Sequence, residues 1–463
     1  MPVLPSDMRT ASSRVVKDLG PVLETGMCIG CGACVAVDER LELVFDERNQ
    51  IWQPSGVGGE EAAGVCPAVQ VDFDDLQSRL FPSQAKTVHG VVEEVYLAQS
   101  TNLERNLAAS SGGLIKELIR ELLEEPGVDG VIALTHIAGL RYEPRLITEL
   151  VAVDRLPGSI YHHIPFDNAL KLLREGEGKR YVLVAIPCQL EGIFTYIFKH
   201  EPALAERIHT TIGLLCGWLY NYHSLRALAQ YKGIEFDDVL GVTYRGGGPV
   251  GKLRLKTTKG EKAVSRRVDF DYQVAFDRTF NTPRCHVCIN HSNFLADIVV
   301  GDAWLPSTVT TRTGISLLIC RKKGTSELVE RLVQKKQAVA TKVTVDEITE
   351  SQTRRVVFGD FAYAYADYLK ETGEHCPDMT GPNRPAARLA DRVQVEKFHS
   401  ELQRKLELQR SQRYRMLWWR KATVESPRLA SRYVRWFLVR ILRIKSILGS
   451  RKEVSRSKIS IFR

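Results

Sequence analysis

Two kinds of hydrophobic pattern alternate along the chain from residue 88 to about residue 340. Short apolar runs typical of buried strands occupy residues 91–99, 128–134, 181–186, 208–216, 296–304 and 316–320. Apolar residues at helical spacing follow several of these runs, at residues 114–125, 190–199, 224–231 and 325–335. Strand and helix signals in this order predict an α/β (α+β) body that contains a mixed sheet. A β-rich interlude at residues 239–268 predicts a hairpin excursion from that body.

The composition is that of an ordinary globular protein, with 44% hydrophobic and 26% charged residues. No apolar signal-peptide region is visible at the N-terminus, and no uncharged apolar run approaches the length of a membrane span. The net charge of +9 is concentrated in residues 401–463, which carry 18 Lys and Arg against 4 Glu. The remaining chain is slightly acidic, which predicts no nucleic-acid partner. Ten cysteines favour a reducing, cytoplasmic location.

Three cysteines repeat at every third position within residues 27–35, MCIGCGACV. The glycines between them let the backbone curl tightly, so that the sulfurs of Cys28, Cys31 and Cys34 converge. Cys66 is the expected fourth ligand, because a proline follows it as in the Cys-Pro that ends ferredoxin-type cysteine runs. This pattern predicts a single iron–sulfur cluster. Zinc is the alternative, although zinc usually takes paired Cys-x-x-Cys units.

Four further cysteines lie in the predicted body. Cys188 and Cys216 each follow or end a predicted buried strand. If the two strands are parallel neighbours, both thiols emerge at the carboxyl edge of the sheet, where ligand sites gather. Cys285 and Cys288 add a Cys-x-x-Cys pair, and the four together predict a second sulfur cage. Each piece alone has another interpretation: a small core residue for the single cysteines, and a zinc or redox pair for the last two.

The C-terminal region after residue 380 is long, charged and helix-prone. Beyond Pro427, apolar residues fall on one face of a predicted helix and arginines lie opposite, and Trp418, Trp419 and Trp436 add interfacial aromatic residues. A basic amphipathic helix of this kind suits peripheral contact with an anionic surface at the inner face of a membrane. A helix packed on its own body or on a partner is the alternative.

Six short motifs, in order along the chain, resemble the coenzyme F420 hydrogenase/dehydrogenase beta-subunit family. That family consists of iron–sulfur flavoproteins and includes 7-hydroxymethyl chlorophyll a reductase. The motifs are the cysteine run at residues 28–34, Ser110-Ser111-Gly112-Gly113, Pro187-Cys188-Gln189, Cys216-Gly217, Cys285-x-x-Cys288, and Ala296-Asp297-Ile298 through Gly301-Asp302-Ala303-Trp304. The resemblance covers about residues 25–340 and leaves the basic tail outside. It implies FAD as the resident cofactor and 4Fe–4S clusters at both cysteine sets.

Physical chemistry supports part of the flavin site that the resemblance implies. The residues immediately before the predicted helix at 114–125 are Ser110, Ser111, Gly112 and Gly113. Hydroxyl caps, free amides and the positive end of the helix dipole suit a pyrophosphate at this point. An ordinary serine cap followed by a glycine turn is the alternative. Asp302 and Trp304 are also expected near the flavin, with Trp304 as an apolar wall.

These observations predict four regions. They are a flexible leader over residues 1–25, a ferredoxin-like 4Fe–4S segment over 26–86, a body with FAD and the second cluster over 87–380, and a basic helical tail over 381–463. The predicted function is that of a cytoplasmic oxidoreductase. It would pass electrons between a one-electron carrier such as ferredoxin and a two-electron acceptor at FAD, either coenzyme F420 or another reducible small molecule.

Two other functions remain open from the sequence. One is an electron-relay subunit that works with a partner redox subunit and has no substrate of its own. The other is a zinc-stabilised binding protein of the membrane surface without a redox role. No general acid stands out, because His286, His291 and Asp302 are equally well explained as supporting or surface residues.

Overall fold

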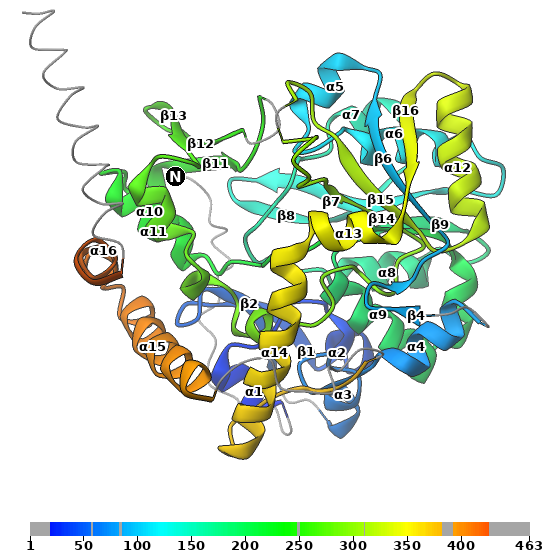
Figure 1. Ribbon diagram of the computed structural model, residues 1–463. Coiled ribbons are helices and arrows are strands. Elements are labelled where there is room, and N and C mark those ends of the chain that lie inside the picture. The colour runs from blue at the N-terminus through cyan, green and yellow to red at the C-terminus, as the bar shows by residue number, and fades with distance from the viewer. Residues whose placement is uncertain are drawn as a thin grey trace, which may run out of the picture.

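An eight-stranded mixed sheet forms the centre of the protein (Figure 1). The computed structural model describes residues 19–56, 59–82, 86–247, 251–309, 311–381 and 392–425. The strand order is β16-β6-β15-β14-β10-β9-β7-β8. Their bounds are β6 (Glu94–Ser100), β7 (Gly130–Ala138), β8 (Arg141–Ile147), β9 (Tyr181–Ala185), β10 (Ile208–Leu214), β14 (Ile298–Asp302), β15 (Ser316–Cys320) and β16 (Ala338–Val343). Strands β6, β7, β9, β10 and β14 share one direction, and β8, β15 and β16 run the opposite way. The predicted α/β body with a mixed sheet is confirmed.

Helices cover both faces of this sheet. One face packs against α6 (Leu114–Leu123), α7 (Leu150–Asp154) and α12 (Lys323–Gln334). The other packs against α8 (Asn168–Glu175) and α9 (Pro187–His200). Successive strand residues point to opposite faces, so Val182 of β9 joins the first core and Leu183 joins the second. A strand buried on both sides reads as a continuous apolar run, which is why the sequence revealed these strands.

The N-terminal segment is a small separate layer below the sheet in Figure 1, drawn in blue. Its elements are α1 (Gly20–Thr25), α2 (Ala33–Val37), β1 (Leu41–Asp46), β2 (Ile51–Gly56), α3 (Glu60–Gly64), β3 (Gln70–Asp72) and α4 (Phe73–Leu80). A two-residue pair, β4 (Lys86–Thr87) and β5 (Gly90–Val91), leads into the main sheet. Leu19 and Val22 are both 1% exposed. The leader expected over residues 1–25 therefore does not extend to residue 25, because α1 is folded into the core of this segment.

The β-rich interlude, predicted as a hairpin excursion, is a three-stranded antiparallel sheet. It comprises β11 (Val239–Thr243), β12 (Lys252–Thr257) and β13 (Gly260–Ser265), flanked by α10 (His223–Tyr231) and α11 (Phe270–Ala275). Short turns of other helix types occur at Pro202–Arg207, Phe236–Asp238, Arg278–Phe280, Pro283–Val287 and Lys421–Glu425. Helix α5 (Leu103–Ala108) follows β6.

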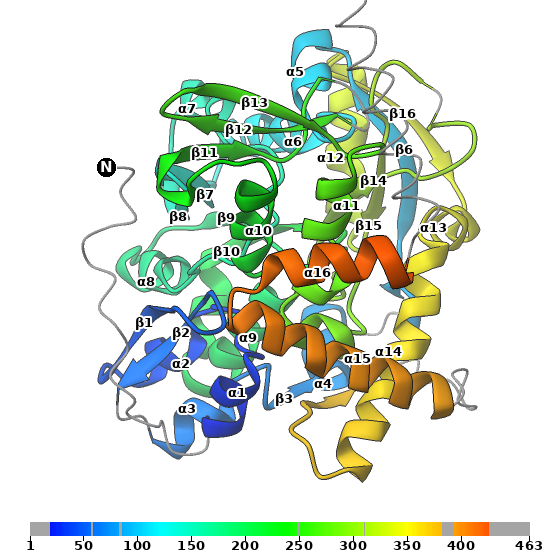
Figure 2. The same ribbon diagram turned by 90° about the vertical axis from the view of Figure 1, so that its left-hand side faces the viewer.

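The chain returns to the N-terminal segment after the sheet is complete. The elements are α13 (Val345–Ser351), α14 (Thr353–Glu371), β17 (Asp378–Thr380), α15 (Arg392–Arg410) and α16 (Tyr414–Arg420). Strand β17 pairs with β3 of the N-terminal segment. Helices α15 and α16 lie side by side across α14 and α11 (Figure 2).

The predicted amphipathic helix beyond Pro427, with Trp436, lies outside the described residues. In the part of the tail that is described, Trp418 packs edge-on against Phe270 and its indole N–H donates to Asp271. Among the described residues, no helix combines the length and apolar character needed to cross a membrane.

Candidate functional site

The first thiol set, Cys28, Cys31, Cys34 and Cys66, lines one cavity of the N-terminal segment. Each of the four side chains is less than one-tenth exposed. Burial, and then the neighbouring Cys66, raise the pKa of the Cys28 thiol to about 12. The pKa values of Cys31 and Cys34 are raised by the same two causes. Four thiolates therefore cannot share this space unless positive charge accompanies them, which is the charge balance that an iron–sulfur cluster or a metal ion provides.

Two glycines shape the loop that carries the first thiol set. Gly30 and Gly32 have φ values of +67° and +80°, in the left-handed region. A Cβ atom at Gly32 would lie 2.3 Å from the Cα of Asp167, and one at Gly30 would lie 2.7 Å from His163. The amide of Phe166 also donates to the carbonyl of Gly30 at 2.8 Å. The cysteine loop is therefore pressed against residues 163–167 of the body, and only glycine fits at the two contacts.

His163 holds this loop from the body side. Its Nε2 lies 3.0 Å from the carbonyl oxygen of Cys28, and the backbone N–H of Trp52 donates to its Nδ1 at 3.2 Å. The two partners assign the proton to Nε2 of a neutral ring. Burial lowers the pKa of His163 to about 4. Sequence reasoning missed this residue, because a histidine outside any motif carries no signal of a partner 135 residues away.

The second thiol set is Cys188, Cys216, Cys285 and Cys288. Strands β9 and β10 are parallel neighbours, as the sequence argument required, and they lead to Cys188 and Cys216 at the same sheet edge. Cys285 lies in the turn Pro283–Val287, with Cys288 directly after it. The pKa of Cys188 is raised, first by loss of hydration, then by Glu191 and by the other three thiols of the set. The fold therefore brings together four thiols from three distant parts of the chain.

Helix α9 joins the two thiol sets. Cys188 lies in its first turn, and Gly192 lies one turn further along. A Cβ atom at Gly192 would lie 2.5 Å from the Sγ of Cys31. The helix therefore carries one ligand candidate of the second set and packs its backbone directly against a ligand candidate of the first.

The donor type is the same in the two sets, since every member is a cysteine. Among the described residues, no three His, Cys, Asp or Glu side chains come close enough to surround one metal ion. A zinc site draws four ligands around a single ion, whereas a four-iron cluster distributes its thiolates over different irons and spreads the sulfurs apart. Both sets offer only sulfur donors, which suit a four-iron cluster or zinc.

The candidate flavin loop lies at the same sheet edge, between α5 and α6. The Ser111 hydroxyl donates to the carbonyl of Ile315 at 3.0 Å, and the amide of Gly112 donates to the hydroxyl of Ser316 at 2.9 Å. Gly113 is the N-cap of α6 and makes no side-chain cap bond. The expected hydroxyl cap is therefore not formed. The Ser111 hydroxyl and the Gly112 amide instead make hydrogen bonds that pack the loop against the start of β15. The first-turn amides of α6 have no side-chain cap.

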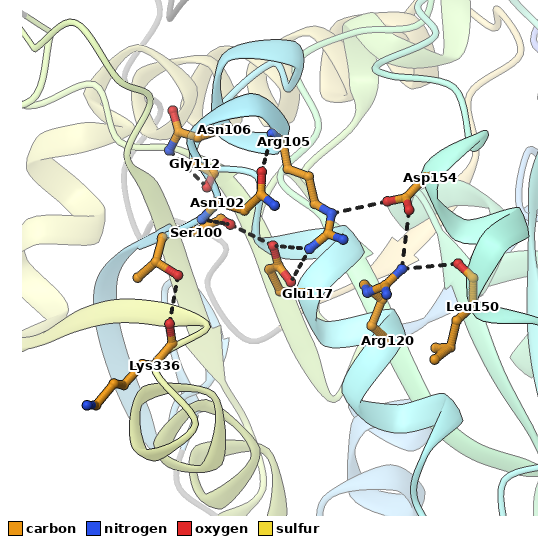
Figure 3. Close-up of polar contacts among 11 residues, drawn as sticks. Ser100, Asn102, Arg105, Asn106, Gly112, Glu117, Arg120, Leu150, Asp154 and Lys336 are labelled. Atoms are coloured by element: carbon orange, nitrogen blue, oxygen red, sulfur yellow. Dashed lines mark hydrogen bonds and ion pairs between the residues drawn. The ribbon is translucent and has the colours of Figure 1, made fainter.

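A buried polar network fixes this loop from the other side (Figure 3). Glu117 of α6, 2% exposed, accepts from the Ser100 hydroxyl at 2.6 Å and pairs with Arg105 of α5 at 3.2 Å. Arg105 also pairs with Asp154 at 3.1 Å. The Asn106 amide donates to the carbonyl of Gly112 at 3.2 Å. The two helices that flank the loop are therefore locked together, which holds the loop in one conformation.

Asp302 and Trp304, at the end of β14, meet a residue that sequence reasoning missed. Arg245, 4% exposed, donates to the carboxylate of Asp302, and its guanidinium lies 5.7 Å from the centre of the Trp304 ring. Trp304 is 44% exposed, so its ring is available to a flat ligand. On the loop side, the Ser159 hydroxyl donates to Ser110 at 2.8 Å. Arg245 lies in the interlude at residues 239–268, whose pattern predicts strands and carries no signal of a contact with Asp302.

Comparison with known proteins decides the family. A model described as the N-terminal part of the coenzyme F420 hydrogenase/dehydrogenase beta subunit matches residues 95–171, and a model of the C-terminal part of that protein matches residues 178–346. Together they cover more than half of the chain. The chain belongs to the coenzyme F420 hydrogenase/dehydrogenase beta-subunit family. The resemblance inferred from the six motifs is confirmed.

Several of the similar proteins are named as F420-dependent oxidoreductases or as subunits of such enzymes. The chain is 24% identical to the coenzyme F420-dependent sulfite reductase of Methanocaldococcus jannaschii, over 69% of this chain and 48% of the relative, so it spans about half of that protein. It is 26% identical to coenzyme F420 hydrogenase subunit beta of Methanococcus voltae, over 47% of this chain and 75% of the relative. A chain of the F420-reducing NiFe hydrogenase complex of Methanosarcina barkeri shares the fold, with a TM-score of 0.50 at 19% identity, covering 66% of this chain and 100% of that chain.

Proposed function

We propose that the protein is an iron–sulfur flavoprotein oxidoreductase. In this proposal it passes electrons between a one-electron carrier and a two-electron acceptor, with FAD and two 4Fe–4S clusters as cofactors. The observation that carries the proposal is the convergence of two separate sets of four thiols in one chain of an F420-linked family. A binding protein stabilised by one structural zinc ion requires one set of ligands. That alternative does not account for a second set of four thiols at a sheet edge.

In this proposal, each thiol set holds one of the two clusters. The first thiol set would hold a cluster in the N-terminal segment over residues 26–86, and the second would hold one in the body over residues 87–380. The second set lies next to the first set, because α9 contacts both. It also lies next to the end of β14, because Leu215, the residue before Cys216, packs against Gly301, the residue before Asp302. This placement supports an electron path that enters at one cage and leaves toward the flavin residues.

The proposed FAD residues lie at the carboxyl edge of the sheet. Ser110 and Gly113 contribute a hydroxyl and the uncapped start of α6, while Ser111 and Gly112 shape the loop. Arg245 supplies a buried positive charge beside Asp302, and Trp304 supplies an aromatic face. FAD, when bound, supplies both hydride and single-electron chemistry.

The electron partners follow from the same reasoning. Several relatives, the Methanococcus voltae protein among them, are named as subunits of F420-linked redox enzymes. We therefore expect a ferredoxin-like carrier or a partner redox subunit on one side, and F420 or another reducible small molecule on the other. These names also favour a second candidate function, a relay subunit without its own substrate.

A visible spectrum with iron, zinc and flavin assays of anaerobically purified protein tests the proposal. Flavin bands over a broad iron–sulfur shoulder are expected, with about eight irons per chain if both four-iron cages are filled. Colourless protein that contains zinc and no flavin would refute it. Adding F420 as the probe to the reduced protein then separates the two candidate functions, since a relay subunit leaves F420 unchanged until a partner enzyme is present.

A further inference from the structure

A buried ion pair lies between the two thiol sets. Glu191 of α9 is 0% exposed and Arg284 is 2% exposed. The Nη2 of Arg284 lies 3.1 Å from the Oε2 of Glu191, and the Asn290 amide donates to the other carboxylate oxygen at 2.9 Å. Removing two charges from water costs more than an apolar pair of similar volume would, so a buried ion pair is weak evidence of a stabilising role. Its position therefore calls for another explanation.

Each member of the pair is attached to both thiol sets. Arg284 is the residue before Cys285 of the second set, and its Nε donates to the carbonyl of Pro67, the residue after Cys66 of the first set, at 3.2 Å. Glu191 lies one helical turn after Cys188 of the second set. The next residue of that helix packs its backbone on Cys31 of the first set.

The pair is placed to act on both sets through its charges. Arg284 brings a positive charge and Glu191 a negative charge into the buried layer between the sets, and each is joined to both sets by the chain or by a direct contact. Charges of opposite sign in a low-dielectric interior act in opposite directions on whatever charge the two sets carry.

The guanidinium of Arg284 faces the second thiol set. Its side chain hydrogen-bonds the Cys288 thiol, and its Nη1 has no oxygen or nitrogen acceptor within the described part of the chain. A bound cluster would present anionic sulfur at this point, which is a stronger acceptor for a guanidinium N–H than a neutral thiol. These contacts support the fit of a cluster at the second thiol set.

We propose that Arg284 and Glu191 form an electrostatic bridge that sets the reduction potentials of both clusters, Arg284 raising them and Glu191 lowering them. Reduction adds one negative charge to a cluster, and a nearby positive charge in a low-dielectric interior stabilises the added electron. The inference rests on the proposed function, because it requires both clusters. It goes further in naming the two residues that determine how readily each cluster accepts an electron.

The test is an anaerobic redox titration of the purified, cluster-loaded full-length protein, followed by electron paramagnetic resonance. Arg284→Gln is expected to shift the reduction equilibrium of both clusters about tenfold toward the oxidised form, which corresponds to about 59 mV for a one-electron couple. Glu191→Gln is expected to shift both in the opposite direction. Arg284→Lys keeps the charge and is expected to stay within about threefold of the wild type.

Two further variants separate charge from packing. The double variant Arg284→Gln/Glu191→Gln removes both charges but keeps two polar side chains of similar size, so its potentials are expected near the wild-type values. If Arg284→Gln does not retain iron, the double variant and Glu191→Gln decide the question. The matched control is Lys232→Gln, which breaks the partly buried ion pairs with Asp269 and Asp271 and is expected to change stability but neither potential.

The outcomes are distinguishable from failure of the proposed function. Wild-type protein without clusters would refute that function itself. Loaded wild-type protein whose potentials are unchanged in both single variants, or shift in the same direction in both, would overturn the bridge alone. Opposite shifts that cancel in the double variant would support it, since a purely structural role does not change sign with charge.

Discussion

The two thiol sets are assembled by different routes. The first comes from one short segment, in which three cysteines lie within seven residues and the fourth follows at residue 66. All four of its thiols are buried. The second is assembled from the ends of two parallel strands and a distant turn, and its four thiols are partly exposed. A local set is therefore shaped by the backbone between its cysteines, whereas a dispersed set depends on the order of strands in the sheet.

This difference has a consequence for stability. The first set lies in a small layer whose core is completed by its own cysteines and by residues of α14 and α15, such as Tyr365 and Leu402. The second lies at one edge of the eight-stranded sheet. Loss of metal is therefore expected to loosen the N-terminal segment and to leave the body folded.

Replacing one cysteine of each set is the strongest test of this contrast. Cys66→Ser and Cys188→Ser are each expected to remove about half of the iron, because each disables one of two cages. Only Cys66→Ser is expected to increase amide hydrogen exchange in residues 19–80. Iron assays and exchange mass spectrometry measure both effects. Cys376→Ser is the matched control and should keep all of the iron; equal exchange in the two cage variants would contradict the contrast.

Gly192→Ala probes the contact where the two sets meet. The added methyl group would lie 2.5 Å from the Sγ of Cys31, so the helix or the cysteine loop has to move. Overpacking of this kind is destabilising by about 1–3 kcal/mol, and we expect iron loss from the first set alone. Gly324→Ala is the control, because that helical position has open space around it and should gain about 0.5–1 kcal/mol. Unchanged iron content in Gly192→Ala would show that α9 does not constrain the first cage.

His163 gives the first set a pH dependence of its own. The pKa of the buried ring is lowered to about 4 from an ordinary value of 6.5, so the unfolded chain takes up the proton first. The contribution of the neutral ring to stability is present above pH 6.5 and is lost progressively as the pH falls from 6.5 toward 4. At pH 5 the loss amounts to about 2 kcal/mol.

The measurement compares unfolding midpoints at pH 7.5 and pH 5. His163→Gln is expected to show a smaller drop between the two pH values than the wild-type protein. His136→Gln, at an exposed position, should follow the wild type. An equal drop in all three proteins would mean that the ring of His163 does not couple the cysteine loop to pH.

Sequence patterns predicted the buried strands better than the edge strands. β9, β10, β14 and β15 all lie within predicted apolar runs, because both of their faces are covered by helices. The edge strands β8 and β16 were not predicted. β8 contains Pro144, and β16 is mostly exposed or half-buried and includes Lys342, since an edge strand faces solvent and has no need of a continuous buried run.

The local sequence by itself determined the glycine–cysteine loop, the strand-end cysteines and the family motifs, because spacing along a covalent chain limits where neighbouring side chains point. Tertiary structure alone decided which distant groups meet. It placed His163 on the cysteine loop, Arg245 beside Trp304, and the Glu191–Arg284 pair between the two cages. Such contacts join residues dozens to more than a hundred positions apart, and no periodicity records them. They exist because strand order and helix packing, and not local propensity, bring those segments together.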